Sequence, residues 1–156
     1  MRMRVIAVGT RMPAWVDAAF ADYAGRLPRT VPLELRELPV VPRGRARDGA
    51  RGRGLESERI ARELRPGDFV IGLCERGREL TTRELATWLG ERMQGGRDLA
   101  FLIGGPDGLD TALLARADFS WSLSRLTLPH ALARVVLAEQ LYRAHALLQG
   151  HPYHRD

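Results

Sequence analysis

Short apolar segments alternate along this chain with segments of helical periodicity, and this alternation constrains the fold more than any other feature. Three of these segments, at residues 4–9, 68–74 and 98–103, are nearly continuous in apolar residues. Strands of this kind are buried on both faces and are typical of a parallel sheet covered by helices on both sides. The sequence therefore predicts an α/β fold with a mostly parallel sheet and helices on both faces. We expect residues 1–156 to form a single domain.

The remaining elements follow from periodicity and from residues that begin or end helices. A half-exposed strand is expected at 33–38, a polar turn at 75–79 and a further strand at 119–123. The apolar face of the first helix is expected at Trp15, Val16, Ala19, Phe20 and Tyr23. Later helices are predicted at residues 55–64, 81–95, 111–117 and about 131–148. A capping box at Thr81 and Glu84 begins the second of these, and Gly95–Gly96 ends it.

The charge balance alone favours a polyanionic partner, but the kind of basic residue weakens that inference. The formal net charge is +5, and all 24 basic residues are arginine. The chain contains neither Lys nor Asn. Both residues have A-rich codons, so a G+C-rich genome would produce this composition without any functional cause. The positions of the arginines are more informative, since five lie in the glycine-interrupted segment 42–54: Arg43, Arg45, Arg47, Arg51 and Arg53. This segment is equally consistent with a solvated loop and with an RNA-facing arm.

Several classes of protein are disfavoured by the sequence. The only cysteine, Cys74, allows no internal disulfide and is interpreted as a small buried hydrophobe rather than a nucleophile. The histidines and the cysteine show no ligand spacing, so we expect no metal site. The apolar runs are shorter than the ~18 residues of a membrane span, and the first residues do not match a signal peptide. A soluble, cytoplasmic protein is expected.

Candidate binding segments lie where predicted strands end, because ligands of open parallel sheets bind at the carboxyl ends of the strands. These segments are 73–77, 103–108 and 123–130. The glycines of 103–108 let a ligand approach the main chain, although an ordinary tight turn explains them equally well. The segment lacks the pattern of a phosphate-binding loop. The three leucines within 123–128 predict a loop covered by a ligand, another subunit or the chain itself.

The last helix and the tail contain further candidates. His130 and Arg134 are four residues apart at the start of the helix. We expect this pair to lie either at the mouth of a pocket formed by the candidate binding segments or in solvent. Glu139 and Arg143 have the spacing of a helical ion pair. In the tail, residues 151–155 group an aromatic ring with two imidazoles and a guanidinium, suited to base stacking and phosphate contact or to docking on the body.

Taken together, these segments resemble one family nearly from end to end. They are VIAVGTRMPAW at 5–15, LIGGPDGL at 102–109, SWSLSRLTLPH at 120–130, RVVLAEQLYRA at 134–144 and HPYHR at 151–155. The chain resembles the RlmH (YbeA-type) family of SPOUT-class ribosomal RNA large subunit pseudouridine N3-methyltransferases. The resemblance is specific because all five segments occur in the same order.

The resemblance implies a C-terminal trefoil knot, a homodimer and S-adenosyl-L-methionine as the methyl donor. The implied acceptor is N3 of a pseudouridine in large-subunit (23S) ribosomal RNA, on the assembled ribosome. By position, the implied cofactor-binding residues are Leu73, Gly104, Leu123, Ser124, Arg125, Leu126, Thr127 and Leu128. The implied acceptor-side catalytic residues are His130, Arg134, Tyr153, His154 and Arg155. The chain departs from the family pattern at Cys74, where an aspartate is expected, and at Asp107, where a glutamate is expected.

The base that takes the proton from N3 is left open by the sequence. His154, His130 and Glu139 are candidates, and spontaneous ionisation of the imide is a further route. We expect the apolar face of the last helix to form the dimer interface, so that the tail of one subunit completes the site of the other. The alternative function is a non-catalytic protein that binds the ribosome or RNA. A nucleotide-binding regulator is disfavoured because a phosphate-binding loop is missing.

Overall fold

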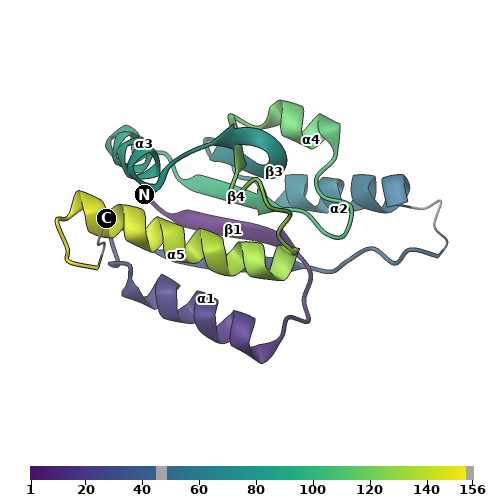
Figure 1. Cartoon of the computed structure of the whole chain (residues 1–156). Helices are drawn as coiled ribbons and strands as arrows, with labels where there is room; N and C mark the ends of the chain where they lie inside the picture. The colour runs from purple at the N-terminus through teal and green to yellow at the C-terminus, as the bar shows by residue number, and fades with distance from the viewer. Residues whose placement is uncertain (45–48, 154–156) are drawn as a thin grey trace.

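The computed structural model describes residues 1–44 and 49–153 (Figure 1). The described elements are, in chain order, β1 (Met3–Val8), α1 (Ala14–Arg26), β2 (Leu33–Leu38), α2 (Gly49–Glu63), β3 (Phe69–Glu79), α3 (Thr82–Gly95), β4 (Leu99–Ile103), α4 (Thr111–Arg116), β5 (Phe119–Ser122) and α5 (His130–Leu148). The strands form one sheet in the order β2-β1-β4-β3-β5, and every pair of neighbours is parallel. The predicted α/β class is confirmed.

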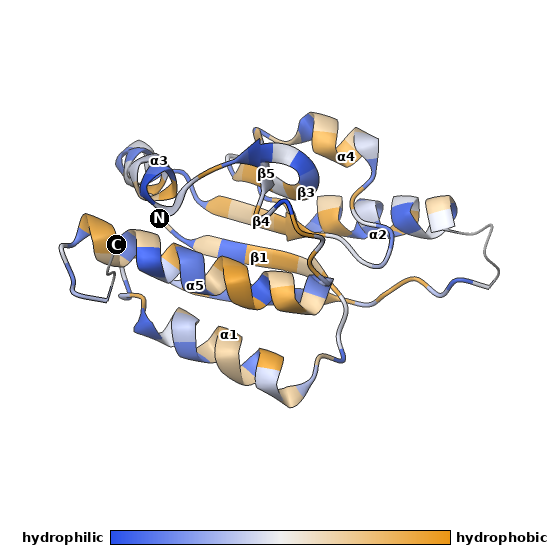
Figure 2. Cartoon of the chain, viewed as in Figure 1, coloured by the Kyte–Doolittle hydropathy of each residue, from blue (hydrophilic) through white to orange (hydrophobic). Residues whose placement is uncertain are grey.

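Helices cover the sheet on both faces. Side chains of β1 alternate between two apolar clusters, because successive residues of a strand point to opposite faces. Met3 and Val5 join the cluster that packs against α1, α3 and α5. Ile6 and Val8 join the cluster that packs against α2 and α4. Figure 2 shows β4 hydrophobic along its length, as expected for a central strand buried on both sides.

The predicted capping box forms at the start of α3. The Thr81 hydroxyl accepts a hydrogen bond from the amide of Glu84 at 3.1 Å, and the amide of Thr81 donates to the Glu84 carboxylate at 2.7 Å. At the other end, Gly96 adopts the left-handed conformation with φ of 73° and caps the helix. Local sequence signals therefore determine both ends of this helix.

The polar turn predicted at 75–79 is wrong, because these residues continue strand β3. The strand curls (Figure 1). Its register against β5 shifts between Leu73 and Arg78, so that both residues pair with Trp121 of β5. Gly77 makes this possible, since a Cβ atom there would lie 2.6 Å from the backbone carbon of Trp121. A bulge of this kind leaves no trace in the hydrophobic pattern.

Two further predictions on helices are corrected by the structure. Trp15 is not part of the buried face of α1 but is 58% exposed, whereas Val16 and Phe20 are buried as predicted. Helix α2 begins at Gly49 and not near residue 55. Glycine disfavours helix formation by ~1 kcal/mol relative to alanine, so propensity could not predict this early start.

We predict that Gly77→Ala destabilises the fold by about 1–3 kcal/mol, since the new methyl group collides with the backbone of β5. The matched control is Gly95→Ala at the end of α3, where a Cβ atom meets nothing within 4 Å. The control should change stability by at most ~1 kcal/mol, and in the stabilising direction. Urea denaturation followed by circular dichroism measures both variants. Equal midpoints for the two variants would contradict the close β3–β5 contact.

Candidate active site at the carboxyl ends of the strands

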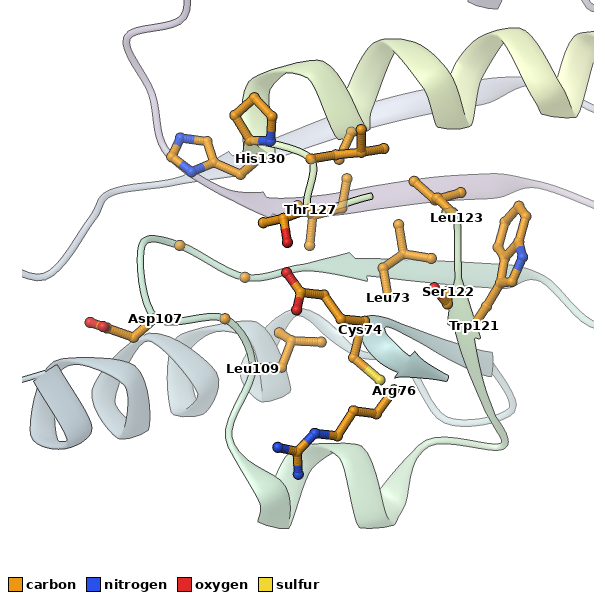
Figure 3. Close-up of a pocket in the computed structure, with 18 of the residues that line it drawn as sticks. Leu73, Cys74, Arg76, Asp107, Leu109, Trp121, Ser122, Leu123, Thr127 and His130 are labelled. Atoms are coloured by element: carbon orange, nitrogen blue, oxygen red, sulfur yellow. The ribbon is translucent and has the colours of Figure 1, made fainter. Parts of the chain in front are cut away.

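A cavity of about 750 Å³ opens beside the middle of β3 and at the carboxyl ends of β4 and β5 (Figure 3). Its walls are residues 73–76 of β3, the turn 103–109 after β4, and the segment 121–130 that leads from β5 into α5. Small-molecule sites typically have volumes of ~300–1,000 Å³, so this cavity is large enough for a nucleoside-sized ligand. The three strand-end segments singled out from the sequence therefore come together around one space.

Most of the expected cofactor-binding residues line this cavity. They are Leu73, Gly104, Leu123, Ser124, Leu126, Thr127 and Leu128. Arg125 is not among the lining residues, and its guanidinium instead pairs with Glu79 at 3.1 Å on the surface. Figure 3 shows Thr127 and Leu123 on one side of the cavity, with Leu73 and Leu109 on the other.

The turn after β4 is shaped by its glycines. The amide of Gly108 donates to the carbonyl of Gly105 at 3.1 Å, and Gly108 has a φ of +73°. A Cβ atom on Gly104 would lie 2.3 Å from the carbonyl carbon of Gly108. The segment is thus both a tight turn and one wall of the cavity, and the two interpretations of its sequence are compatible.

The loop after β5 presents an apolar side chain that the described residues leave uncovered. The hydroxyl of Ser122 donates to the carbonyl of Ser124, and the Ser124 hydroxyl accepts from the amide of Leu126, both at 2.9 Å. These bonds fix the loop, yet Leu126 is 74% exposed at the cavity. Of the three kinds of cover expected from the sequence, the described part of this chain does not provide one, which leaves a ligand or a second subunit.

His130 and Arg134 lie in different environments despite their helical spacing. His130 lines the cavity, and its pKa is lowered by burial first and by the nearby Arg134 second, with a small opposing effect of Glu56. Arg134 is fully buried and does not line the cavity. Its guanidinium donates to Glu37 at 2.5 Å and to the carbonyl of Gly9 at 2.7 Å. The interpretation as a solvated pair is therefore wrong, because Arg134 ties α5 to the ends of β1 and β2.

The described part of the tail docks on the last helix, away from the cavity. The Tyr153 hydroxyl donates to Glu139 at 3.1 Å, and its ring lies 4.6 Å from that of Tyr142. Burial, together with hydrogen bonds to Tyr23 and Glu139, raises the pKa of Tyr153 to about 12. Tyr142 is separated from His130 by about 18 Å of helix axis at 1.5 Å per residue. Tyr153 therefore does not reach the cavity of its own chain.

The other two tail residues expected on the acceptor side, His154 and Arg155, lie outside the described residues. The predicted ion pair between Glu139 and Arg143 is confirmed at 2.6 Å. Glu139 therefore binds both Arg143 and Tyr153, and it does not line the cavity.

Cys74 and Arg76 lie in the predicted binding segment 73–77, whereas Arg53 is a residue of the cavity wall that the sequence interpretation missed. Cys74 is partly exposed at the cavity, so its predicted burial is wrong. Arg76 and Arg53 also line the cavity. Arg76 was placed in a turn, and Arg53 was one of several arginines in a glycine-rich segment. Only the curl of β3 and the early start of α2 bring these two residues to the site.

Residues 1–44 and 49–153 lack the features of two other kinds of site. Within these ranges there is no cluster of three or more His, Cys, Asp or Glu side chains arranged to hold a metal ion. In the same ranges, no helix has the length and apolar character needed to span a bilayer.

Comparison with known proteins places the chain in a family. Residues 1–154 match the family model described as "Predicted SPOUT methyltransferase". The chain belongs to this family. It is therefore an enzyme of the SPOUT methyltransferase class, and the resemblance inferred from the sequence is confirmed.

Individual proteins agree with this assignment. Relatives named "Ribosomal RNA large subunit methyltransferase H" include one from Thioalkalivibrio sulfidiphilus, 54% identical over 156 residues and 100% of both chains. Another, from Bordetella pertussis, is 54% identical over 155 residues and 99% of both chains. The solved structure of a probable methylase family protein from Haemophilus influenzae Rd KW20 has a TM-score of 0.56 and 16% identity. It covers 99% of this chain and 70% of that chain, and it supports the fold alone.

We predict that the His130 imidazole titrates below the ordinary value of 6.5, which NMR can follow through its ring protons. The resonance is assigned by its loss in His130→Gln. Because the pKa is lower in the folded than in the unfolded state, the neutral imidazole contributes stability that is complete above 6.5. This contribution is lost as the pH falls through the folded-state pKa. A midpoint at or above 6.5 would contradict the burial of His130.

Proposed function

We propose that this chain transfers a methyl group from S-adenosyl-L-methionine to N3 of a pseudouridine in large-subunit (23S) ribosomal RNA, on the assembled ribosome. The cavity beside β3 and at the carboxyl ends of β4 and β5 carries this proposal, because two of its wall segments, 103–109 and 121–130, belong to the segments that carry the family resemblance. The names of the relatives, which act on large-subunit ribosomal RNA, support the choice of acceptor. Because ribosomes are the substrate, we expect the protein to act in the cytoplasm.

The lining of the cavity fits a nucleoside with a charged sulfur centre. The turn 103–109 and the loop 123–128 offer main-chain N–H and C=O groups, which suit the hydrogen-bonding edge of a nucleobase. Leucine side chains from both walls provide apolar cover for the rings: Leu73, Leu109, Leu123 and Leu128. When bound, S-adenosyl-L-methionine supplies a methyl group already activated by its positive sulfur.

The protein therefore contributes mainly by positioning the methyl donor and the acceptor base and by removing one proton from the acceptor. Methyl transfer is an in-line displacement, and holding both partners in line can supply a large part of the rate enhancement. The apolar walls also exclude water from the reacting atoms. The pseudouridine N3 must lose its proton before it becomes a good nucleophile.

Among the candidate bases, His130 is the one that lines the cavity within the described part of the chain. Its lowered pKa keeps the imidazole neutral near pH 7, and a neutral imidazole can accept a proton. Glu139 is already bound by Arg143 and Tyr153. We therefore place His130 on the acceptor side, with spontaneous ionisation of the imide as the alternative route.

We further propose a homodimer in which the tail of one subunit completes the site of the other. Tyr153 docks far from its own cavity, while specific RNA recognition needs ~1,000–2,500 Å² of protein surface. Helix α5 carries incompletely buried apolar residues that suit an interface, among them Leu132, Val135 and Val136. The C-terminal trefoil knot of the family stays a prediction for this chain.

We predict that the protein labels the large-subunit RNA of ribosomes that lack the modification when it is given tritiated S-adenosyl-L-methionine. The label should map to N3 of a single pseudouridine and should disappear when that position is a uridine. Free RNA and isolated large subunits, tested in parallel, define the required substrate. Binding of the methyl donor without any transfer would instead support the non-catalytic, ribosome-binding alternative.

We also predict that two inactive variants restore activity when they form mixed dimers. Tyr153→Ala removes the tail aromatic, and Cys74→Trp fills the cavity from β3. If each site combines the cavity of one chain with the tail of the other, random mixing should restore about a quarter of wild-type activity. No recovery from folded, dimeric variants would show that each chain uses its own tail. Full activity of Tyr153→Ala alone would remove the tail from the acceptor site.

A further inference from the structure

A buried carboxylate organises the segment that precedes helix α2. The side chain of Glu56 is 1% exposed, and it accepts a hydrogen bond from the amide of Val41 at 2.9 Å. The guanidinium of Arg43 donates to both oxygens of the same carboxylate, at 2.8 and 2.9 Å. This two-point contact has the fork geometry that makes arginine–carboxylate pairs specific.

The same guanidinium continues to the wall of the cavity. Nε and Nη2 of Arg43 donate to Asp107 at 3.1 and 2.9 Å. Asp107 lies in the turn 103–109 that lines the cavity, whereas Arg43 does not line it. Arg43 thus connects a fixed, buried anion on α2 with a partly exposed anion on the ligand-binding turn.

Glycines make room for this cluster. A Cβ atom on Gly52 would lie 2.5 Å from the Arg43 guanidinium, and one on Gly105 would lie 3.0 Å from the Glu56 carboxylate. A Cβ atom on Gly49 would lie 3.4 Å from the carboxylate of Asp107. The glycines at 49 and 52 therefore belong to a packed contact between α2 and the cavity wall, which explains part of the Arg- and Gly-rich composition of this segment.

The geometry excludes two simpler roles for Arg43. A solvated loop arginine would not bind two carboxylates, one of them buried. An arginine that recognises RNA phosphate would need free N–H groups, but here Nε, Nη1 and Nη2 all donate within the protein. Arg43 is therefore separated in role from Arg53, which lines the cavity itself.

We propose that Arg43 is a positioning residue, which holds Asp107 and with it the turn 103–109 in the conformation that binds the methyl donor. Glu56 orients Arg43, and Asp107 transmits the restraint to the turn. Only the identity of the ligand rests on the proposed function. Because Asp107 is 41% exposed, losing its charge should cost little global stability while freeing the turn to leave its ligand-binding position.

The test measures two properties of each variant. Calorimetry gives the affinity for S-adenosylhomocysteine, and steady-state kinetics gives the KM for S-adenosyl-L-methionine and kcat separately. Asp107→Asn should raise both Kd and KM about five- to tenfold, because apparent affinity falls with the fraction of molecules in the competent conformation. The melting temperature and kcat at saturating methyl donor should stay unchanged. Asp107→Glu keeps the charge and should restore most of the affinity. The matched control is Glu63→Gln, which breaks the exposed pair with Arg36 and should have no effect.

A second variant distinguishes positioning from direct contact between Asp107 and the ligand. Arg43→Gln combined with Glu56→Gln removes both partners and leaves no unpaired buried charge. It should weaken binding as much as Asp107→Asn, and all three substitutions together should weaken it no further. Additive losses, or an unchanged Kd in folded Asp107→Asn, would overturn the positioning role. Failure of the wild-type protein to bind S-adenosylhomocysteine would instead count against the proposed function.

Discussion

Parallel pairing of the strands in the order β2-β1-β4-β3-β5 brings the segments that follow them to one edge of the sheet. Within the described part of the chain, this edge is where chemistry can be assembled, because the strands are otherwise covered by helices on both faces. The cavity depends directly on this arrangement, since its walls are residues 73–76 within β3 and the segments that follow β4 and β5. The curl of β3 closes one side and brings Arg76 to the cavity.

Arginine side chains hold this edge together from two directions. Arg134 is buried between α5 and the ends of β1 and β2, where it binds Glu37 and the main chain of Gly9. On the other side, Arg43 joins α2 to the turn after β4. Removing one partner of a buried charge pair costs far more than removing a surface charge. Arg43 and Arg134 therefore serve the architecture of the site.

The fold could be predicted from the sequence where residues close together in the chain determine the structure. The strands that are apolar on both faces and the capping box of α3 are examples. The cavity could be located because parallel strands end on a common edge. The bulge in β3, the exposure of Trp15 and the burial of Arg134 could not be predicted, because each depends on contacts between residues far apart in the chain. Arg43 illustrates this limit, since both of its carboxylate partners lie outside its own loop.

We propose that the cavity bounded by residues 103–109 and 121–130 holds the methyl donor. A crystal structure of the protein with S-adenosylhomocysteine is the decisive measurement. We expect the nucleoside between these two segments, with its base edge bonded to main-chain groups and Leu126 closing over it. Both segments packed tightly on their own side chains, with the compound bound elsewhere, would show that this cavity is not the donor site.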